Sequence, residues 1–388
     1  MNIKETSKKY EKYTIDMRRE FHMNPEPSMH EVRTAGRIKE ELDKIGVPYI
    51  SIGKSGVVAT IQGKNKGKTI ALRADIDALE VNEARDIPYK SKNEGFMHAC
   101  GHDAHGAMLL GAAHVLNEIK DEFNGTVKLI FQPGEETAQG AKAMIKGGAL
   151  DGVDEVFGMH VMGNIPSGKI AVGGGPRMAS ADMFKITVKG AGGHGSMPNL
   201  GVDAVVAASA IVMNLQTLVS REISPMESVV VSVGKLTSGT RFNVIADSAI
   251  MEGTTRCFSY EIRKQLPEMM ERIIKSTAAS YRAEANLKYT LLTAPLINNE
   301  ESSERAKRSV EKIMSKDAVA EFDKTPGGED FSEYLELVPG TFVIVGTANK
   351  EKDTCYSNHH PMFNIDEDML VNGVALHAQY AYDFLMNE

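Results

Sequence analysis

Residues 126–136 read TVKLIFQPGEE, an apolar β-type run that stops at Pro133 and is followed at once by Glu135 and Glu136. Proline lacks the N–H group that a sheet ladder requires, so it marks the end of the strand. Open α/β sheets bind ligands just beyond the carboxyl ends of their strands. This stretch therefore predicts an α/β sheet with two carboxylates at its ligand-binding edge.

Strand and helix patterns alternate on both sides of this run. An amphipathic helix pattern over 32–45 ends at Gly46, and an earlier one ends at Asn24 and Pro25. Further β-type runs lie at 57–61, 69–73, 156–160 and 342–345, and helix patterns at 104–120, near Ala141, at 302–314, at 331–335 and from Glu367 onward. This alternation predicts an α/β fold, with a mixed sheet covered by helices.

Residues 182–296 follow a different pattern. Strand, helix, strand, strand, helix and strand succeed one another at 183–188, 202–219, 228–233, 248–256, 260–281 and 287–292. This β-α-β-β-α-β order is that of the ferredoxin-like α+β unit. We therefore expect an inserted domain at 182–296 and a discontinuous first domain made of 1–181 and 297–388.

The composition restricts the classes of partner. The 388 residues carry 44 Lys and Arg against 52 Asp and Glu, a net charge of −8, which argues against binding to nucleic acid. Three cysteines spread along the chain do not form a disulfide framework, and the N-terminus has no apolar signal segment. The apolar stretch 202–215 is too short to cross a membrane. These features predict a cytoplasmic protein.

Four strand-end segments concentrate groups that can bind metal. Cys100 and His102 project to the same side of an extended segment, as two ligands of one site must. Single residues of this kind often have structural roles, and the two glutamates could simply begin the helix near Ala141. Their coincidence in one domain nevertheless predicts a metal centre drawn from Cys100, His102, Glu135, Glu136, His160, His359 and His360.

Other catalytic readings have less support. Residues 190–195, GAGGHG, match the glycine pattern of dinucleotide sites, but Pro198 follows and no strand ends in an acidic residue about 20 positions later. The sequence contains neither a Gly-x-Ser-x-Gly elbow nor a His-Glu-x-x-His helix. Cys100 could be a nucleophile, although the neighbouring His102 favours a role as a ligand.

With these residues in view, the sequence resembles the metallo-aminoacylase and carboxypeptidase family over nearly its whole length. The resemblance is to the amidohydrolase branch, which contains hippurate hydrolases, N-acetyl-diaminopimelate deacetylases and plant auxin-conjugate hydrolases. The segments that carry it are 73–79, 100–105, 132–136, 193–198, 239–245, 328–331 and 359–363. The resemblance implies a metallopeptidase-like catalytic domain with an inserted lid and dimerisation domain.

The resemblance also implies roles for individual residues. Two divalent ions per subunit, from among zinc, manganese, nickel and cobalt, would be held by Cys100, His102, Glu136, His160 and His359, with His360 left out. Glu135 would be the general base and acid, and Asp103 and His105 would orient ligands. His194 would reach the metal site of the partner subunit in a homodimer, and Asn243 and Arg256 would hold the substrate.

The implied reaction is hydrolysis of the amide bond of a small N-acyl amino acid, with an acetyl or aroyl group. Three positions depart from the family pattern, namely Glu80, Arg241 and Ala246, and Arg241 lies beside Asn243, where it could change specificity. Two rival functions remain at this point. One is a catalytically silent metal- or ligand-binding protein, and the other is a nicotinamide-dependent oxidoreductase that uses residues 190–195.

Overall fold

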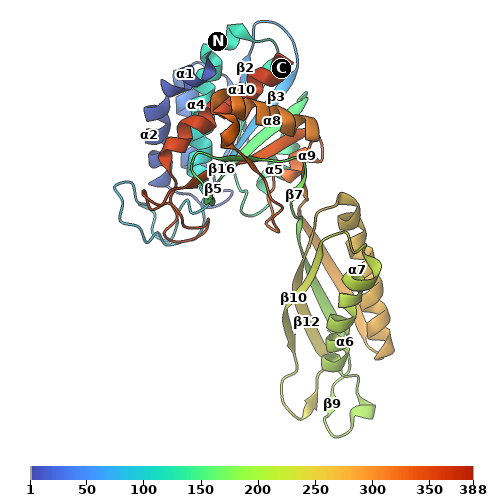
Figure 1. Cartoon of the computed structure of the whole chain (residues 1–388). Helices are drawn as coiled ribbons and strands as arrows, with labels where there is room; N and C mark the ends of the chain where they lie inside the picture. Colours follow the sequence, from blue (N-terminus) through green and yellow to red (C-terminus); the bar gives the residue numbers. More distant parts are fainter. Residues whose placement is uncertain (1, 388) are drawn as a thin grey trace. The chain divides into compact units, whose positions relative to one another are not determined.

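The computed structural model describes residues 2–387, which divide into two compact units (Figure 1). Unit 1 contains residues 2–175, 297–323 and 330–387, and unit 2 contains residues 176–296 and 324–329. Two short strands, β7 (Gly175–Met178) and β14 (Leu296–Asn298), mark where the chain passes between units. The division falls six residues before the expected position 181/182, because 181 − 175 = 6, and it assigns 324–329 to unit 2.

Unit 1 is built on a sheet of eight strands in the order β1-β2-β4-β3-β5-β16-β6-β15. β3 pairs in parallel with β4 and β5, and β5 with β16, whereas β1, β2 and β4 form antiparallel pairs. The sheet is therefore mixed, as predicted. The strands are β1 (Tyr49–Ile52), β2 (Gly56–Gln62), β3 (Thr69–Asp75), β4 (Thr126–Gln132), β5 (Glu155–Pro166), β6 (Ile170–Val172), β15 (Val319–Glu321) and β16 (Gly340–Ala348).

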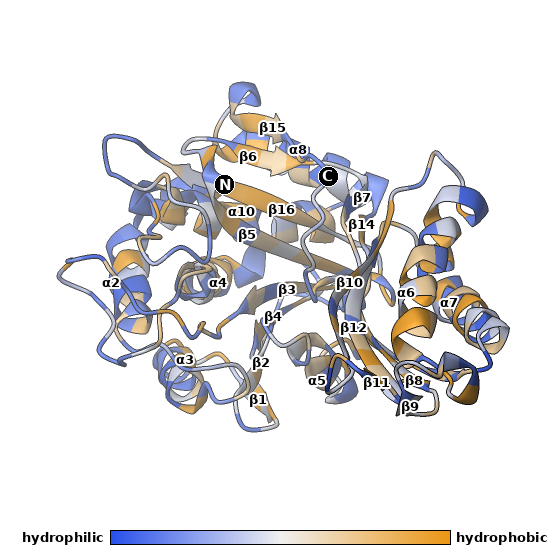
Figure 2. Ribbon diagram, turned by 90° about the horizontal axis from the view of Figure 1, so that it is seen from below, coloured by the Kyte–Doolittle hydropathy of each residue, from blue (hydrophilic) through white to orange (hydrophobic). Residues whose placement is uncertain are grey.

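The helices of unit 1 cover this sheet. α4 packs on β3 and β5, α10 packs on α4, and α5 packs on β4 and α9. The central strands β5 and β16 are largely apolar (Figure 2), as expected for strands buried on both faces. The helices are α1 (Ile3–Lys8), α2 (Glu11–His22), α3 (Val32–Lys44), α4 (His102–Glu118), α5 (Gly140–Lys146), α8 (Glu300–Ile313), α9 (Ser332–Leu335) and α10 (Leu370–Leu385).

The two faces of the sheet differ in chemistry because successive strand residues point to opposite sides. Leu72 and Leu129 belong to the large apolar core that includes α4 and α10. Arg73 and Gln132 lie on the other face, where both donate hydrogen bonds to Asp330, just before α9. Polar groups, among them Arg73, Gln132 and Asp330, are therefore buried on this second face of the sheet.

Unit 2 has the β-α-β-β-α-β order predicted for a ferredoxin-like insert. Its antiparallel sheet has the order β10-β12-β8-β13, and the buried residues of α6 and α7 join those of the sheet in one core. The elements are β8 (Ala181–Lys189), α6 (Ala204–Thr217), β10 (Val229–Ser238), β12 (Ser248–Cys257), α7 (Tyr260–Ser280) and β13 (Glu284–Thr293).

The apolar helix of unit 2 is longer than the stretch 202–215, which on its own is too short to cross a membrane. α6 continues into a π-helical turn, η3 (Leu218–Glu222), so that 19 residues from Ala204 to Glu222 form one helix whose length and composition could span a membrane. Core helices pass the same test, and Ile211, Leu215 and Leu218 are buried in unit 2. Length alone therefore does not exclude a membrane span, although packing accounts for one apolar face.

Candidate metal centre

Cys100 occupies the centre of a buried polar site at the start of α4. Gly101, which follows it, has φ +91, and a side chain there would place its Cβ 2.3 Å from Val161 Cγ2. Only glycine combines this left-handed conformation with so close an approach. The Cys-Gly-His sequence therefore turns sharply into the helix, and both Cys100 and His102 remain buried beside β5.

Three imidazole rings surround the Cys100 thiol. Nε2 of His160 lies 3.4 Å from Sγ, and Nε2 of His359 lies 3.3 Å from it. The ligand atoms of Cys100, His102 and His160 all lie within 4.8 Å of one another. His359 has φ +69, and its backbone N–H donates to Ala99 O, which brings its loop against the Cys100 segment.

The hydrogen bonds of two of these histidines leave Nε2 facing the thiol. His102 Nδ1 donates to Asp77 Oδ1 at 3.0 Å, and His160 Nδ1 donates to Val161 O at 2.7 Å. Among the described residues, His102 Nε2 is buried without a hydrogen-bond partner. This is the tautomer that a metal-binding imidazole adopts when its second nitrogen is held by an oxygen atom.

The two glutamates lie on the turn that follows β4. Glu136 Oε1 lies 3.6 Å from His359 Nε2, and it too is buried with no hydrogen-bond partner in the described chain. Its ligand atom groups with those of Cys100 and His359 within 4.8 Å. Glu135 is half-buried, and its Oε1 accepts a hydrogen bond of 3.4 Å from Asp330 N.

The five expected ligands thus form two groups of three that share the Cys100 sulfur. One group is Cys100, His102 and His160, and the other is Cys100, Glu136 and His359. Burial raises the pKa of the Cys100 thiol and of the Glu136 carboxyl, because each charged form loses its hydration. Adjacent cations would offset this cost, and sulfur, nitrogen and oxygen donors in this number fit two divalent metal ions.

In a third group of potential ligands, Asp75, His102 and His105, the ring of His105 is already fully hydrogen-bonded. His105 Nδ1 donates to Asp75 Oδ1 at 2.5 Å, and its Nε2 accepts from Val161 N at 2.9 Å. Burial and the neighbouring His102 lower the pKa of His105, although Asp75 opposes this shift. Both ring nitrogens are engaged, so His105 supports the adjacent His160 ring, 4.6 Å away, and is not free to bind metal.

Two carboxylates that we did not assign to the site support it from the last residue of β3 and the segment just beyond it. Besides its bond to His102, Asp77 accepts a 3.1 Å hydrogen bond from Glu136 N through Oδ2, and Asp75 Oδ2 lies 3.6 Å from His102 Nε2. Burial alone would raise the pKa of Asp77, but His102 lowers it overall. The available signal was a pair of carboxylates at alternate positions of a strand end, within the segment 73–79.

The other expected orienting residue, Asp103, has a different set of contacts. Its Oδ2 accepts hydrogen bonds from Arg18 at 2.8 Å and from His22 at 2.7 Å, so it connects α4 to α2. Asn358, to which we assigned no role from the sequence, donates to Cys100 O and to Val161 O at 3.0 Å each. His360 points elsewhere, since its ring stacks on Tyr356 at 4.8 Å.

In unit 2, His194 and Asn243 lie at a two-strand ladder. β9 (Gly193–His194) pairs with β11 (Val244–Ile245), and Gly195 N donates to Asn243 O at 2.9 Å. His194 is exposed, and its Nδ1 lies 2.8 Å from Ser196 Oγ. The glycine pattern at 190–195 therefore leads into β9 and a short 3-10 turn, whereas a dinucleotide site would require a helix there.

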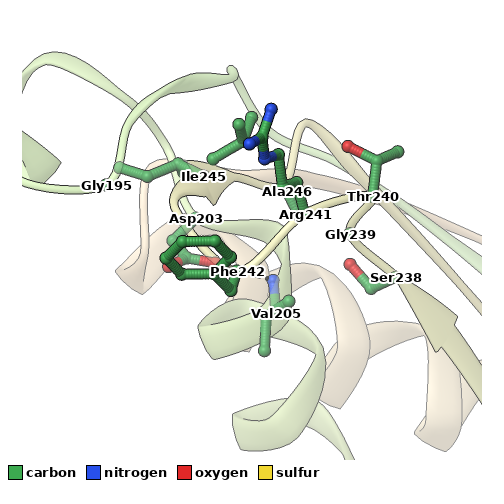
Figure 3. Close-up of a pocket in the computed structure, with 11 residues that line it drawn as sticks. Gly195, Asp203, Val205, Ser238, Gly239, Thr240, Arg241, Phe242, Ile245 and Ala246 are labelled. Carbon is green, nitrogen blue, oxygen red and sulfur yellow. Dashed lines mark hydrogen bonds between the residues drawn. The ribbon is translucent and has the colours of Figure 1, made fainter.

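The loop beside this ladder encloses a hollow of about 580 Å³ lined partly by Gly195, Asp203 and Arg241. Figure 3 shows the side chains of Arg241 and Phe242 leaving the loop in different directions. Phe242 is 94% exposed. Arg256 lies elsewhere in unit 2, on β12, where its guanidinium donates to Thr255 O at 2.9 Å and to Thr254 Oγ1. Unit 1 therefore brings all five expected ligands and Glu135 together, and unit 2 carries His194, Asn243 and Arg256.

Comparison with known proteins agrees with this architecture. The model of peptidase family M20/M25/M40 matches residues 71–383. An N-acetylcysteine deacetylase of Bacillus subtilis is 42% identical over 372 residues, 95% of each chain, and the IAA-amino acid hydrolase ILR1-like 2 of Arabidopsis thaliana is 40% identical over 96% of this chain and 85% of its own. The solved Bacillus subtilis YXEP protein, a dinuclear metal-binding peptidase, has a TM-score of 0.87 and 38% identity over 98% of this chain and 99% of its own. The chain therefore belongs to peptidase family M20/M25/M40.

Proposed function

We propose that the protein is a metal-dependent amidohydrolase that cleaves N-acyl amino acids, with an acetyl or aroyl group, into a carboxylate and a free amino acid. The observation that carries this proposal is the pair of three-donor groups that share Cys100, with Glu135 beside them. The names of the relatives, a deacetylase of an N-acetyl amino acid and a hydrolase of IAA-amino acids, support the same substrate class.

Each divalent ion is assigned to one group of donors. Cys100, His102 and His160 would hold one ion, and Cys100, Glu136 and His359 would hold the other. Bound divalent ions make a water molecule easier to ionise and polarise the carbonyl oxygen of the substrate. A shared thiolate favours zinc, nickel or cobalt, and manganese is a further candidate.

Glu135 acts as the general base and acid. It belongs to neither group that contains Cys100, and its half-buried side chain lies one residue from the ligand Glu136. Glu135 takes a proton from the attacking water and delivers it to the leaving amine as the amide bond breaks. Asp77, Asp75 and His105 hold the ligands in place, while Asp103 ties α4 to α2.

Unit 2 supplies the substrate-binding groups of a homodimer. The exposed His194 of one subunit donates a hydrogen bond to the developing oxyanion at the metal site of the other, and Asn243 and Arg256 hold the substrate carboxylate. Unit 2 suits contact with a second copy of the chain because Val205, Val206 and Met213 of α6 are exposed apolar residues and β10 is an edge strand.

The enzyme is assigned to the cytoplasm. Its three cysteines are free, and Cys355 is exposed, which suits a reducing compartment. Cell fractionation of the source organism would test this assignment, and recovery in a secreted or membrane fraction would contradict it.

The first experiment separates the roles of the neighbouring glutamates. Wild type, Glu135→Ala and Glu136→Ala are reconstituted with zinc, nickel, cobalt or manganese and assayed on a panel of N-acetyl and N-benzoyl amino acids. We expect Glu136→Ala to lose bound metal and activity, and Glu135→Ala to retain metal and lose turnover. Equal metal loss in both variants would contradict the assignment, and a fully loaded wild type without turnover would favour a silent binding protein.

The second experiment tests whether His194 acts across subunits. Inactive Glu135→Ala and His194→Ala homodimers are mixed, and subunit exchange is verified by native mass spectrometry. A hybrid dimer then contains one site with both residues intact, so part of the activity should return. Exchange without any recovery would overturn the assignment, as would a protein that remains monomeric yet fully active.

A further inference from the structure

Glu31 is a buried residue that lies far along the sequence from every metal-binding motif. It binds the turn that carries Glu135 and Glu136. We propose that Glu31 is a positioning residue for Glu135, acting through the backbone of Gly134. The inference rests on the proposed function, because it assigns Glu135 the role of proton carrier. The inference adds residues 26–31 to the candidate site, although this segment contributes none of the proposed metal ligands.

The contacts of Glu31 converge on this turn. Its Oε1 accepts hydrogen bonds from Gly134 N at 2.8 Å and from Met29 N at 2.7 Å, and its Oε2 accepts from Ser55 Oγ at 2.7 Å. The side chain is completely buried. Hydrogen bonds to an ionised carboxylate are shorter and stronger than neutral ones, and these three distances fall in that range.

The turn combines a left-handed glycine with one strained residue, so a hydrogen bond from another segment helps to fix its conformation. Gly134 has φ +64, and Ala138, four residues later, has φ +54, a conformation that non-glycine residues rarely adopt. A Cβ at Gly134 would lie 2.4 Å from Met29 Sδ, so the 26–31 segment is in close contact with the turn. Met29 itself has φ +66, and its N–H is held by the same carboxylate oxygen as that of Gly134.

Two carboxylates bracket Glu135 along the chain. Glu31 holds the N–H of Gly134 on one side, and Asp77 holds the N–H of Glu136 at 3.1 Å on the other. Ser28 joins the two anchors because its Oγ donates to Asp77 Oδ2 at 2.6 Å. Loss of Glu31 should therefore release Gly134 and Glu135 while Asp77 still holds the ligand Glu136, so the proton carrier moves and the metal ligand stays.

Burial of the ionised Glu31 carboxylate costs free energy, and none of its hydrogen-bond partners carries a positive charge that would offset this cost. Its three hydrogen-bond donors are two backbone amides and a hydroxyl, and burial raises the pKa of the Glu31 carboxyl. Glutamine could make the same three contacts, with its amide oxygen accepting from both backbone groups and its NH2 donating to Ser55 Oγ. The variant Glu31→Gln should therefore keep the hydrogen bonds to the turn while removing the charge of the side chain.

The test compares Glu31→Ala, Glu31→Gln and Ser55→Ala with wild type. For Glu31→Ala we expect kcat to fall about 30-fold, since small misplacements of a reacting group can cost about 100-fold, while KM stays within about twofold and two metal ions remain bound. Glu31→Gln should recover kcat to within about threefold of wild type. Ser55→Ala removes only the hydrogen bond to Oε2, so its kcat should lie between those of the two Glu31 variants. It provides a second test if Glu31→Ala does not fold.

A matched control removes another buried carboxylate of unit 1. Glu155 accepts hydrogen bonds from Ser302 and Arg305 of α8 and from Tyr380 of α10, and these helices do not form the turn that carries Glu135. Glu155→Gln and Glu155→Ala should lower the melting temperature without a specific loss of kcat. The proposal is overturned if metal content falls in parallel with kcat in Glu31→Ala, if Glu31→Gln is as impaired as Glu31→Ala, or if the Glu155 variants lose kcat equally.

A readout independent of turnover separates this inference from the proposed function. Hydrogen–deuterium exchange of a peptide covering residues 133–140 should accelerate in Glu31→Ala and return toward wild type in Glu31→Gln. If wild type hydrolyses no amide yet shows this pattern, the proposed function fails and the structural half of the inference stands. Unchanged exchange in Glu31→Ala would overturn the inference even in an active enzyme.

Discussion

The candidate metal centre of unit 1 and the segments around His194 and Asn243 in unit 2 present their side chains in opposite ways. Cys100, His102 and His160 are buried, and both histidines have a fixed Nδ1 partner. His194 and Asn243 are exposed, and neighbouring Phe242 is 94% exposed. The first site is preorganised by its own chain. The second has the surface expected of groups that acquire their surroundings from a substrate or a second subunit.

The largest effect should come from breaking the buried ionic network behind the metal centre. Arg73 donates to Asp75 and Asp330 at 2.6 Å each, and all three side chains have no exposure. Burial raises the pKa of Asp330 to about 6, even though Arg73 opposes the shift. Arg73→Met leaves two buried carboxylates without their cation, so we expect about 3–5 kcal/mol of destabilisation.

Thermal and urea unfolding would measure the Arg73→Met effect. The double variant Arg73→Met/Asp330→Asn should recover part of the loss, because one of the uncompensated charges is then absent. A loss of unfolding free energy below about 1 kcal/mol in Arg73→Met would show that the stability of unit 1 does not depend on this network. The contrast between a preorganised site in unit 1 and an exposed one in unit 2 would then lose its support.

The next largest effect concerns the support of the ligands. Asp77 holds both His102 Nδ1 and Glu136 N, one ligand from each three-donor group. Asp77→Ala should weaken metal affinity about 10- to 100-fold, as the loss of a residue that orients ligands commonly does. Competition with a chelator, read by metal analysis, would measure this change. Ser196→Ala is the matched control in unit 2, because Ser196 contacts His194 and should leave metal affinity unchanged.

The sequence predicted the parts of the molecule that have a periodic or chemical signal. β4 was expected at 127–131 and runs from Thr126 to Gln132, and α7 was expected at 260–281 and runs from Tyr260 to Ser280. The three- and four-residue strands β1, β6 and β15 were missed, because so short a run has little alternation to detect. The helix pattern that was expected to end at Asn24 and Pro25 corresponds to two helices, α1 and α2, and α2 ends at His22.

The sequence singled out the candidate metal ligands and one residue that supports them, His105, but it did not single out Asp77 or Glu31. Cysteine, histidine and glutamate at strand ends carry a chemical signal, whereas the partners of Asp77 and Glu31 lie 25 and 103 residues away along the chain. Only the folded chain brings such partners together. For the same reason the assignment of residues 324–329 to unit 2 depends on contacts that no local pattern encodes.

A smaller effect should distinguish the two regions in acid. Burial lowers the pKa of His377, in α10, to about 3. An unfolded histidine has a pKa of about 6.5, so the unfolded state binds more protons below that value, and stability is present above pH 6.5 and lost as pH falls toward 3. Unit 1 should lose about 1.3 kcal/mol through this residue between pH 7 and pH 5.5.

The variant His377→Leu removes this titration. Its melting temperature should therefore fall less than that of wild type between pH 7 and pH 5.5, whatever its stability at pH 7. His194 of unit 2 is exposed, and His194→Ala, measured in the same way, is the matched variant that removes a histidine from the other unit. Identical pH dependence in wild type and His377→Leu would show that His377 is protonated without cost.

The smallest effect should come from the charged residues on the open face of the unit 2 sheet. Glu252 lies 3.8 Å from Lys185 and 3.3 Å from Lys235, and all three side chains are more than 40% exposed. Water and salt screen such pairs, so Glu252→Gln should change unfolding by no more than about 0.5 kcal/mol, and less at 1 M salt. A loss comparable to that of Arg73→Met would show that this face is covered in solution. Glu252 would then be buried in solution, as the charged groups of unit 1 are, and a second subunit would be the first partner to test as the cover of this face.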